Sequence, residues 1–452
     1  MMTSKNNNKP NIVRSNEIYE LAKKIIPAGT QTYSKGVSQF VEGFSPKYLD
    51  HGKGAYVWDV DGNKYLDYIM GCHPLVLGYS DPDVNAAVIK QLEKGSTFSL
   101  MNELEVSVSK LLVDIIPCAE MVRFGKNGAD ATTAGVRVAR AVTGRDHIAY
   151  CGYHGWHDWY IANTDLNSGI PDFNKKLAHS FSYNNLDSLE KVFKEYPDQV
   201  AIVIMEPLTV LKPKNNFLHE VQKMAKHYGA ILMFDEIITG FRFSLGGAQD
   251  LLGVTPDLSS FAKGISNGIP LSALVGKKEY MEALDKTFFS FTYGGDCIGL
   301  SAAEACIPKL QRENVPDHLW NVGKVLKDGF NQLAATHNLE EFMQCIGYPC
   351  RSIISFNGRG KYNELELKSI LQQELVRRGV LWTGYHALSW SHTSEEINLT
   401  LNAYDESMSV VKNIITTGTR IRDHIEGSLI KPVFREVADF NSYIMKDVKK
   451  IT

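Results

Sequence analysis

The sequence of 452 residues contains no long apolar run and little excess of charge of either sign. No stretch approaches the ~20 apolar residues that a transmembrane helix needs, and the polar N-terminus lacks the apolar core of a signal peptide. The formal net charge of −3 gives no electrostatic reason to expect nucleic acid or an anionic membrane as a partner. We therefore expect a globular protein with neither of those partners.

Paired cysteines are also missing. The seven cysteines are scattered, and the one close pair, Cys345 and Cys350, has the spacing of neither a zinc site nor a redox motif. Free thiols in a reducing cytoplasm, without a metal site, are the simplest interpretation. Internal repeats and low-complexity linkers are absent as well, so we expect the parts of the chain to pack together.

The spacing of apolar residues predicts an α/β architecture for the first two thirds of the chain. A helix is predicted near 15–27 and a β-hairpin at 54–67. From about 105 to 300, helical patterns alternate with short apolar strands, among them 147–151, 201–205, 231–234 and 272–275. Strands that are buried on both faces and separated by helices are typical of a mainly parallel sheet.

After residue 310 the pattern changes. A long helix is predicted near 317–336, strands near 351–356 and 395–401, and a further helix from about 404 to 424. This mixture predicts a smaller α+β unit.

Two residues carry the clearest chemical signal. Asp235 ends an apolar strand, and Lys263 lies between an apolar approach and an exit rich in small residues, Gly264, Ser266, Asn267 and Gly268. Pyridoxal phosphate chemistry requires such a pair: a lysine amine that forms a Schiff base, and a carboxylate that keeps the pyridine nitrogen protonated. Glycines let the backbone approach a bulky ligand, and partial desolvation would lower the pKa of the lysine.

Each residue also has a simpler explanation when it is taken alone. Asp235 could cap a turn, and Lys263 could be an ordinary surface lysine. We favour the functional interpretation because ligands of open α/β sheets bind where the parallel strands end. Ile237 would point the same way as Asp235 along an extended chain, so it could lie flat against the cofactor ring.

Two further segments fit the same cofactor. Gly125–Thr133 precedes the helical run 134–142, and N–H groups at a helix start can bind a phosphate. Tyr153 directly follows the strand 147–151 and could stack on the pyridine ring. A glycine turn before a helix is weak evidence by itself, and aromatic clusters such as Tyr153–Trp159 more often serve packing.

These motifs, in this order, resemble the class III, fold-type I pyridoxal-phosphate aminotransferases, and most of all the glutamate-1-semialdehyde 2,1-aminomutases. The resemblance begins at Ile26–Gly29, includes Gly54–Gly62 and continues to Gly294 and Gly295. It implies a large domain with a mainly parallel seven-stranded sheet, plus a smaller α+β domain. The boundaries we expect are 1–70 for an N-terminal segment that packs with the small domain, 71–310 for the cofactor-binding domain, 311–430 for the small domain and 431–452 for a tail.

The resemblance also assigns roles to single residues. It implies that Lys263 forms the Schiff base, that Asp235 pairs with the pyridinium, and that Gly128 and Ala129 donate to the phosphate. The family usually has Ser-Gly-Thr where this chain has Asn127-Gly128-Ala129. Tyr153 and Ile237 match the residues on the two faces of the ring. Thr292 matches a threonine that reaches the phosphate of the neighbouring subunit, which implies a homodimer with shared active sites.

The chain departs from the aminomutases where they bind their substrate. Lys35 stands where those enzymes have an arginine for the substrate carboxylate, and lysine lacks the bidentate fork of arginine. Gly71–Pro74 contains Cys72 in place of their tryptophan, and His386 stands near a position that is acidic in them. A pocket with Tyr33, His73, Tyr385 and His386 would suit a hydroxylated, sugar-like carbonyl compound, although several of these residues could simply pack.

We therefore predict a cytoplasmic, homodimeric aminotransferase that moves an amino group from a donor such as glutamate to an aldehyde or ketone. Lys35, His73 and His386 are the predicted substrate residues. The alternatives are a glutamate-1-semialdehyde aminomutase and, in another class, a catalytically silent relative with a binding or structural role. The retained lysine, aspartate and phosphate turn argue against the silent relative.

Overall fold

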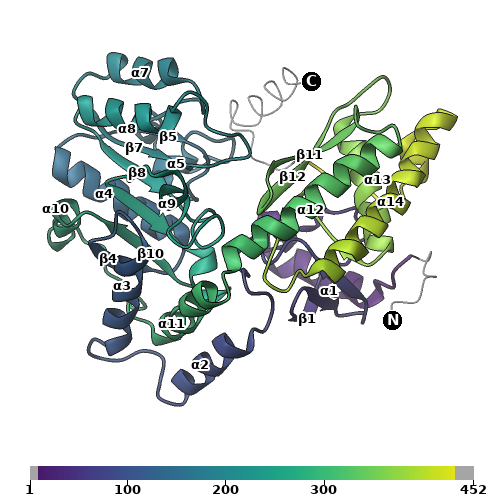
Figure 1. Ribbon diagram of the computed structural model, residues 1–452, viewed down its shortest axis with the longest axis horizontal. Coiled ribbons are helices and arrows are strands. Elements are labelled where there is room, and N and C mark those ends of the chain that lie inside the picture. Colours follow the sequence, from purple (N-terminus) through teal and green to yellow (C-terminus); the bar gives the residue numbers. More distant parts are fainter. Residues whose placement is uncertain (1–8, 433–452) are drawn as a thin grey trace. The chain divides into compact units, whose positions relative to one another are not determined.

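The computed structural model describes residues 9–432, which form two units (Figure 1). One unit comprises the described residues up to Asp81 together with those from Asp317 onward, and the other comprises Pro82–Pro316. These divisions lie 11 and 6 residues after the boundaries expected at 70 and 310. The predicted tail, 431–452, lies almost entirely outside the described residues. No helix between residues 9 and 432 is long and apolar enough to cross a membrane.

The unit formed by Pro82–Pro316 is built on a seven-stranded sheet, which confirms the predicted architecture. The strands lie in the order β4-β10-β9-β8-β7-β5-β6, and all neighbours are parallel except those of β10, which is antiparallel to both β4 and β9. Their bounds are β4 Met121–Gly125, β5 His147–Cys151, β6 Ala178–Ser180, β7 Val200–Met205, β8 Ile231–Asp235, β9 Leu258–Phe261 and β10 Ser272–Gly276.

Helices cover this sheet on both faces. Alternate residues of a strand point to opposite sides of the sheet, so each strand contributes side chains to two cores. Ile202 and Ile204 of β7 belong to the core that α4 (Gly128–Thr143) closes, whereas Val203 and Met205 belong to the core under α7 (Leu186–Glu195) and α8 (Phe217–His227). The unit's other helices are α2 Pro82–Leu92, α3 Glu103–Ile115, α5 Asp158–Ile161, α6 Asp172–Lys175, α9 Ala248–Leu252, α10 Lys278–Met281, α11 Cys297–Arg312 and the short turns η4 Lys263–Ser266 and η5 Glu282–Asp285.

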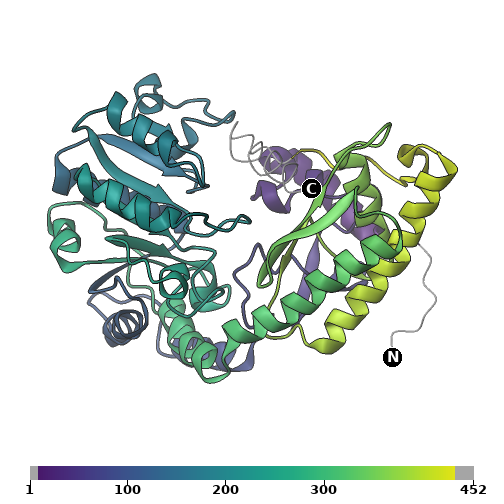
Figure 2. The same cartoon turned by 45° about the horizontal axis from the view of Figure 1, so that its top comes forward.

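The other unit has two small sheets and long helices. One sheet has the order β1-β2-β3-β13 and the other β11-β12-β14. The bounds are β1 Leu49–Lys53, β2 Tyr56–Asp59, β3 Lys64–Asp67, β11 Met343–Tyr348, β12 Arg351–Phe356, β13 Val380–Leu381, β14 Tyr385–Ala387, α1 Val13–Ile25, α12 Val315–Thr336, α13 Glu364–Arg377, α14 Ser394–Thr417, η1 Pro27–Gly29, η2 Tyr33–Lys35, η3 Val37–Gln39 and η6 Ile421–His424. Figures 1 and 2 show α12 and α14 side by side, where Phe330 packs edge-on against Tyr404.

One predicted strand is wrong. Residues 395–401 begin α14, which runs unbroken from Ser394 to Thr417. Thr393 caps this helix, since its hydroxyl accepts the Glu395 N–H at 3.2 Å while the carboxylate of Glu396 accepts the Thr393 N–H at 3.0 Å. This reciprocal cap is a helix-start signal that outweighs the short alternation of apolar and polar residues after it.

Candidate active site

The predicted cofactor residues gather where parallel strands end. In the parallel pair β8 and β9, Asp235 at the end of β8 lies opposite Ser260. Lys263 follows β9 after a single residue and begins the turn η4. Both residues therefore emerge at the carboxyl edge of the sheet. Lys263 has a φ of +46°, a left-handed conformation that is uncommon for a residue other than glycine and that often marks a functional site.

Asp235 is held by three hydrogen bonds in a buried setting. One carboxylate oxygen lies 2.8 Å from His154 Nδ1, and the other accepts the Ser260 hydroxyl at 3.3 Å and the Ile237 N–H at 3.2 Å. The side chain of Asp235 is 3% exposed and that of His154 is fully buried. These contacts fix the direction of the Asp235 carboxylate. A carboxylate that pairs with the pyridine nitrogen of a cofactor must have such a fixed direction.

His154 is a site residue that the sequence interpretation missed. Its Nδ1 contacts Asp235, its carbonyl accepts the Thr132 hydroxyl at 2.9 Å, and its Nε2 has no hydrogen-bond partner among residues 9–432. The rings of Tyr150, Trp159 and Tyr160 surround it. In the sequence, the one indication of a role for His154 is its position directly after Tyr153. Its contact with Asp235 depends on the order of the strands in the sheet.

The turn between β4 and α4 offers two backbone donors. The Asp130 carboxylate accepts the N–H groups of Lys126 and Asn127, at 3.0 and 2.7 Å. The N–H groups of Gly128 and Ala129, the first two of α4, have no acceptor in the described part of the chain. The start of a 16-residue helix also carries partial positive charge, so this turn suits a phosphate.

Close packing joins this turn to the two other segments. A Cβ at Gly128 would lie 2.5 Å from Cδ1 of Ile237, and one at Gly155 would lie 2.7 Å from Cβ of Ala129. A glycine is needed at both positions for the backbones to approach. Gly128, Ala129, Ile237 and the Tyr153–Gly155 segment therefore lie together.

Tyr153 follows β5 at the same edge of the sheet. The residue is 37% exposed, and its ring meets that of Tyr160 edge-on at 5.4 Å between centroids. Its backbone N–H donates to Oε1 of Glu206, which follows β7, at 3.1 Å. Glu206 is a second buried residue of this region that the sequence interpretation did not include.

Thr292 lies in a turn just before α11 and is exposed. With one chain described, its predicted reach to a neighbouring subunit stays a prediction.

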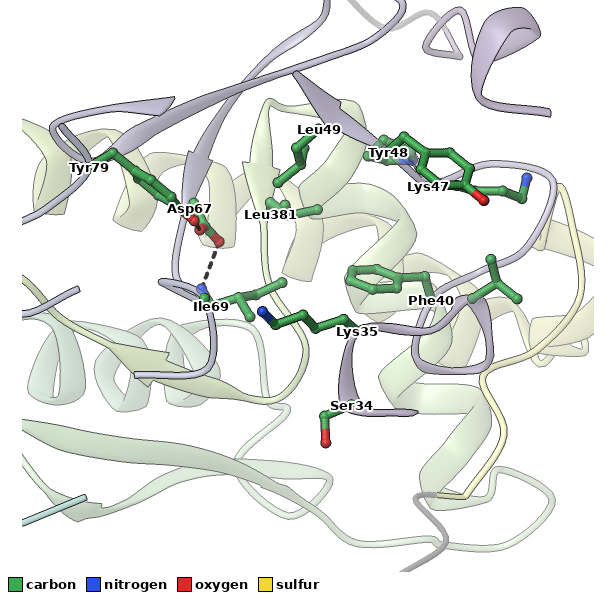
Figure 3. Close-up of a pocket in the computed structure, with 13 residues that line it drawn as sticks. Ser34, Lys35, Phe40, Lys47, Tyr48, Leu49, Asp67, Ile69, Tyr79 and Leu381 are labelled. Atoms are coloured by element: carbon green, nitrogen blue, oxygen red, sulfur yellow. Dashed lines mark hydrogen bonds between the residues drawn. The ribbon is translucent and has the colours of Figure 1, made fainter. Parts of the chain in front are cut away.

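The other unit contains the predicted substrate residue Lys35, which lines a pocket of about 360 Å³ (Figure 3). The side chain of Lys35 points toward Ile69 and Asp67, and its ammonium has no hydrogen bond or ion pair among the described residues. Most of the pocket surface is apolar, with contributions from Val37, Phe40, Pro46, Leu49, Ile69 and Leu381. Polar side chains also line it, from Ser34, Lys47, Tyr48 and Tyr79.

Asp67 forms the polar end of this pocket. Its carboxylate accepts the N–H groups of Ile69 at 2.7 Å and Met70 at 3.0 Å, and the Tyr79 hydroxyl at 2.6 Å. Burial raises the pKa of Asp67 to about 6, and the hydrogen bonds and the Lys35 charge oppose that rise. The carboxylate anchors a run of left-handed residues, Met70–His73, that follows it.

The structure argues against the predicted substrate contact of His386. The ring is fully buried, with Nδ1 2.8 Å from the Ser352 hydroxyl and Nε2 2.8 Å from the Tyr404 hydroxyl. Both nitrogens are thus used inside the unit, and neither is open to a ligand. His73 is also largely buried, with its ring stacked on Tyr385 at 4.4 Å, so its predicted substrate role rests on the sequence alone.

Comparison with known proteins identifies the family of this chain. The sequence model of class-III aminotransferases matches residues 42–382. The chain belongs to that family. It is 38% identical over 416 residues to the 3-aminobutyryl-CoA aminotransferase of Cloacimonas acidaminovorans, a match that covers 89% of this chain and 99% of that protein.

Solved structures of the family share the fold. The FumI protein of Sphingopyxis sp. MTA144, in its pyridoxal-phosphate internal aldimine form, has a TM-score of 0.84 at 26% identity over 91% of this chain and 99% of its own. A glutamate-1-semialdehyde aminomutase of Pseudomonas aeruginosa PAO1 (variant K286A) has a TM-score of 0.77 at 21% identity over 88% and 94%. The predicted family, fold type, enzyme class and cofactor are therefore confirmed.

The residues of this chain fit pyridoxal phosphate. The two unused N–H groups at Gly128 and Ala129 suit its phosphate, and the buried Asp235 carboxylate suits its ring nitrogen. Gly128 and Ile237 pack so closely that a single added methyl group would intrude between them.

Proposed function

We propose that Lys263 binds pyridoxal phosphate covalently and that Asp235, Gly128, Ala129, Tyr153 and Ile237 hold it. The observation that carries this proposal is the buried Asp235–His154 contact at 2.8 Å, at the strand edge that also bears Lys263. Bound there, the cofactor supplies an electron sink for the substrate Cα.

Lys263 is the proposed acid–base group. Its Nζ would hold the cofactor covalently and, when released by the substrate amine, would serve as the base for the proton on the substrate Cα, because it is the base tethered at the reacting centre. Asp235 would keep the ring nitrogen of the bound cofactor protonated, and His154 together with Ser260 fixes the direction of the Asp235 carboxylate.

For the substrates, we propose an exchange between an amino-acid/keto-acid pair such as glutamate and 2-oxoglutarate, and a β-amino/β-keto acyl thioester. The relative named for 3-aminobutyryl-CoA, which is 38% identical, supports the second pair. The mostly apolar surface of the Lys35 pocket, together with the ammonium groups of Lys35 and Lys47, favours a substrate with an apolar chain and an anionic group over a polyhydroxylated sugar. The sugar-like acceptor also loses one of its supports, since His386 is committed to Ser352 and Tyr404.

The test of the covalent site is chemical. Borohydride reduction of the cofactor-loaded protein, followed by peptide mapping, should place the pyridoxyl group on Lys263. A label on another lysine would contradict the assignment, and a protein without visible absorbance from bound cofactor would favour a catalytically silent relative.

The test of the substrate is a screen. 3-Aminobutyryl-CoA with 2-oxoglutarate is compared with free 3-aminobutyrate, glutamate semialdehyde, and keto- or aldehydo-sugars, free and nucleotide-linked. We expect turnover of the thioester to exceed that of the free acid. Lys35→Met should raise the KM for the thioester by about tenfold with little change in kcat, since it removes a binding charge. Lys53→Met, at an exposed position in β1, is the matched control.

Two other outcomes of the screen would contradict the proposed thioester substrate. Formation of 5-aminolevulinate without thioester turnover would establish the aminomutase instead. Amination of a sugar alone would restore the sugar-like acceptor.

A further inference from the structure

We propose that Lys126 positions the phosphate turn from behind and does not itself bind the cofactor phosphate, a role that rests on the proposed function. Lys126 directly precedes Asn127 and Gly128, where an ammonium could be expected to contact a bound phosphate. Its Nζ instead donates to Oδ2 of Asp296 at 2.6 Å and to the Pro270 carbonyl at 3.3 Å.

The surroundings of this ammonium are shaped to receive it. The side chains of Lys126 and Asp296 are only 18% and 17% exposed, and the Gly299 N–H donates to the same carboxylate oxygen at 3.1 Å. A Cβ at Gly299 would lie 2.8 Å from the Pro270 carbonyl oxygen and 3.3 Å from Lys126 Nζ. Glycine thus leaves the space that the ammonium approaches, and the contact is a charge-assisted hydrogen bond with little access to water.

Three segments meet at this point. Lys126 begins the phosphate turn, Pro270 ends the segment that starts with Lys263, and Asp296 caps α11. The backbone N–H of Lys126 is also fixed, by the Asp130 carboxylate at 3.0 Å. The residue is therefore held at both its backbone and its side chain, and the N–H groups of Gly128 and Ala129 are the donors left for a phosphate.

Loss of the ammonium would leave Asp296 without its cation and would release the turn from the Lys263 segment. Breaking one side of a partly buried ion pair costs more than the pair contributes, because the remaining charge stays desolvated. The effect should fall on phosphate affinity, since Asp235 and Lys263 keep their own contacts.

The experiment is titration of the apoprotein with pyridoxal phosphate and with pyridoxal, which lacks the phosphate. We expect Lys126→Met and Asp296→Asn each to raise the Kd for pyridoxal phosphate by about tenfold. The double variant should be no worse than either single one, because both remove the same interaction. Pyridoxal affinity should change little, and Lys126→Arg, which retains the charge, should recover most of the loss.

A matched control is available in the same unit. Lys277 Nζ lies 2.6 Å from Asp257 Oδ1, at the opposite edge of the sheet, so Lys277→Met removes an ion pair of equal length away from the turn. It should leave the affinity for pyridoxal phosphate unchanged. Should Lys126→Met fail to fold, the isosteric Asp296→Asn carries the test.

Direct phosphate binding by Lys126 predicts the opposite for Asp296→Asn: the ammonium is released and affinity is kept or improved, which would overturn the positioning role. Equal losses for pyridoxal phosphate and pyridoxal would overturn it too. A wild-type protein that binds no pyridoxal phosphate would refute the proposed function, whereas normal wild-type binding with unaffected variants would refute only the role of Lys126.

Discussion

At the scale of single residues, the site depends on buried polar groups that hold one another in place. Asp235 would be costly to bury as a lone carboxylate, and its contacts with His154, Ser260 and the Ile237 N–H compensate for lost water. A protonated ring nitrogen of the cofactor would add a further contact to the Asp235 carboxylate. The residues that support the carboxylate thus fix its direction.

Asp235→Asn separates charge from hydrogen bonding. We expect the variant to keep most of its cofactor affinity and to lose about 100-fold or more in turnover, because a neutral amide cannot hold the ring nitrogen protonated. The measurement is the rate of a single half-reaction, followed by cofactor absorbance. His154→Asn, which can keep a donor near the Nδ1 position, should lose far less than Asp235→Asn. Near wild-type rates for Asp235→Asn would make Asp235 a structural cap.

Because His386 is buried, we expect the free energy of unfolding to depend on pH. Burial, with a smaller contribution from His392, lowers the pKa of His386 from 6.5 to about 3. The unfolded chain therefore binds a proton at this residue between pH 6.5 and 3 that the folded chain does not. This residue's contribution is full above pH 6.5 and falls by about 1.4 kcal/mol for each pH unit below it.

The check is urea unfolding across that range. His386→Gln should make the fall of unfolding free energy with decreasing pH shallower, by up to one proton, whatever it does to stability at pH 7. His51→Gln is the control, since that ring is exposed at the surface. An unchanged slope for His386→Gln would contradict the linkage.

At the scale of elements, the sequence predicts best what is local. The strands 147–151, 201–205 and 231–234 are short apolar runs between helical patterns, and the structure has them at nearly the predicted bounds. The sequence predicts a strand at the beginning of α14 because the apolar residues Ile397, Leu399 and Leu401 alternate with polar ones. The face that α14 buries instead includes Ile397, Thr400, Ala403, Tyr404, Ser407 and Met408, where polar Thr400 and Ser407 hide the helical period.

His154 and Glu206 could not be found from local pattern. His154 follows β5 and Asp235 ends β8, and β7 lies between these strands in the sheet. Their contact therefore depends on strand order, which neighbouring residues do not encode. Asp235 and Lys263 are recognisable in the sequence because Asp235 ends an apolar strand, Lys263 follows one, and both match a motif.

The turn from β4 into α4 yields a prediction about packing. Gly128→Ala would place a Cβ 2.5 Å from Cδ1 of Ile237, so the turn or Ile237 must shift. We expect the Kd for pyridoxal phosphate to rise by about tenfold or more. Gly135→Ala in the same helix is the control: its Cβ would meet the flexible side chain of Met233, so it should affect the melting temperature more than cofactor affinity. An unaltered Kd for Gly128→Ala would show that the turn can relax.

At the scale of the whole molecule, the exposed apolar residues of Pro82–Pro316 favour a partner chain. Leu100 and Met101, before α3, are 81% and 85% exposed, and Phe288 and Tyr293, before α11, are 77% and 60% exposed. The two segments are neighbours, since the Cys297 N–H donates to the Ser96 carbonyl at 2.8 Å. An exposed apolar surface of this kind is typical of an interface. Thr292 lies on the second segment, which agrees with its predicted role in a shared active site.

A homodimer with shared sites predicts complementation between inactive variants. In a mixed dimer of Lys263→Ala and Thr292→Ala, one site carries both lesions and the other has an intact Lys263 together with an intact Thr292 from its partner. Mixing the two proteins under conditions that exchange subunits should therefore restore activity, provided that Thr292→Ala alone is strongly impaired. Lys263→Ala mixed with Asp235→Asn is the control, because every site then keeps a lesion and no activity should return. An active protein that sediments as a monomer would rule the shared site out.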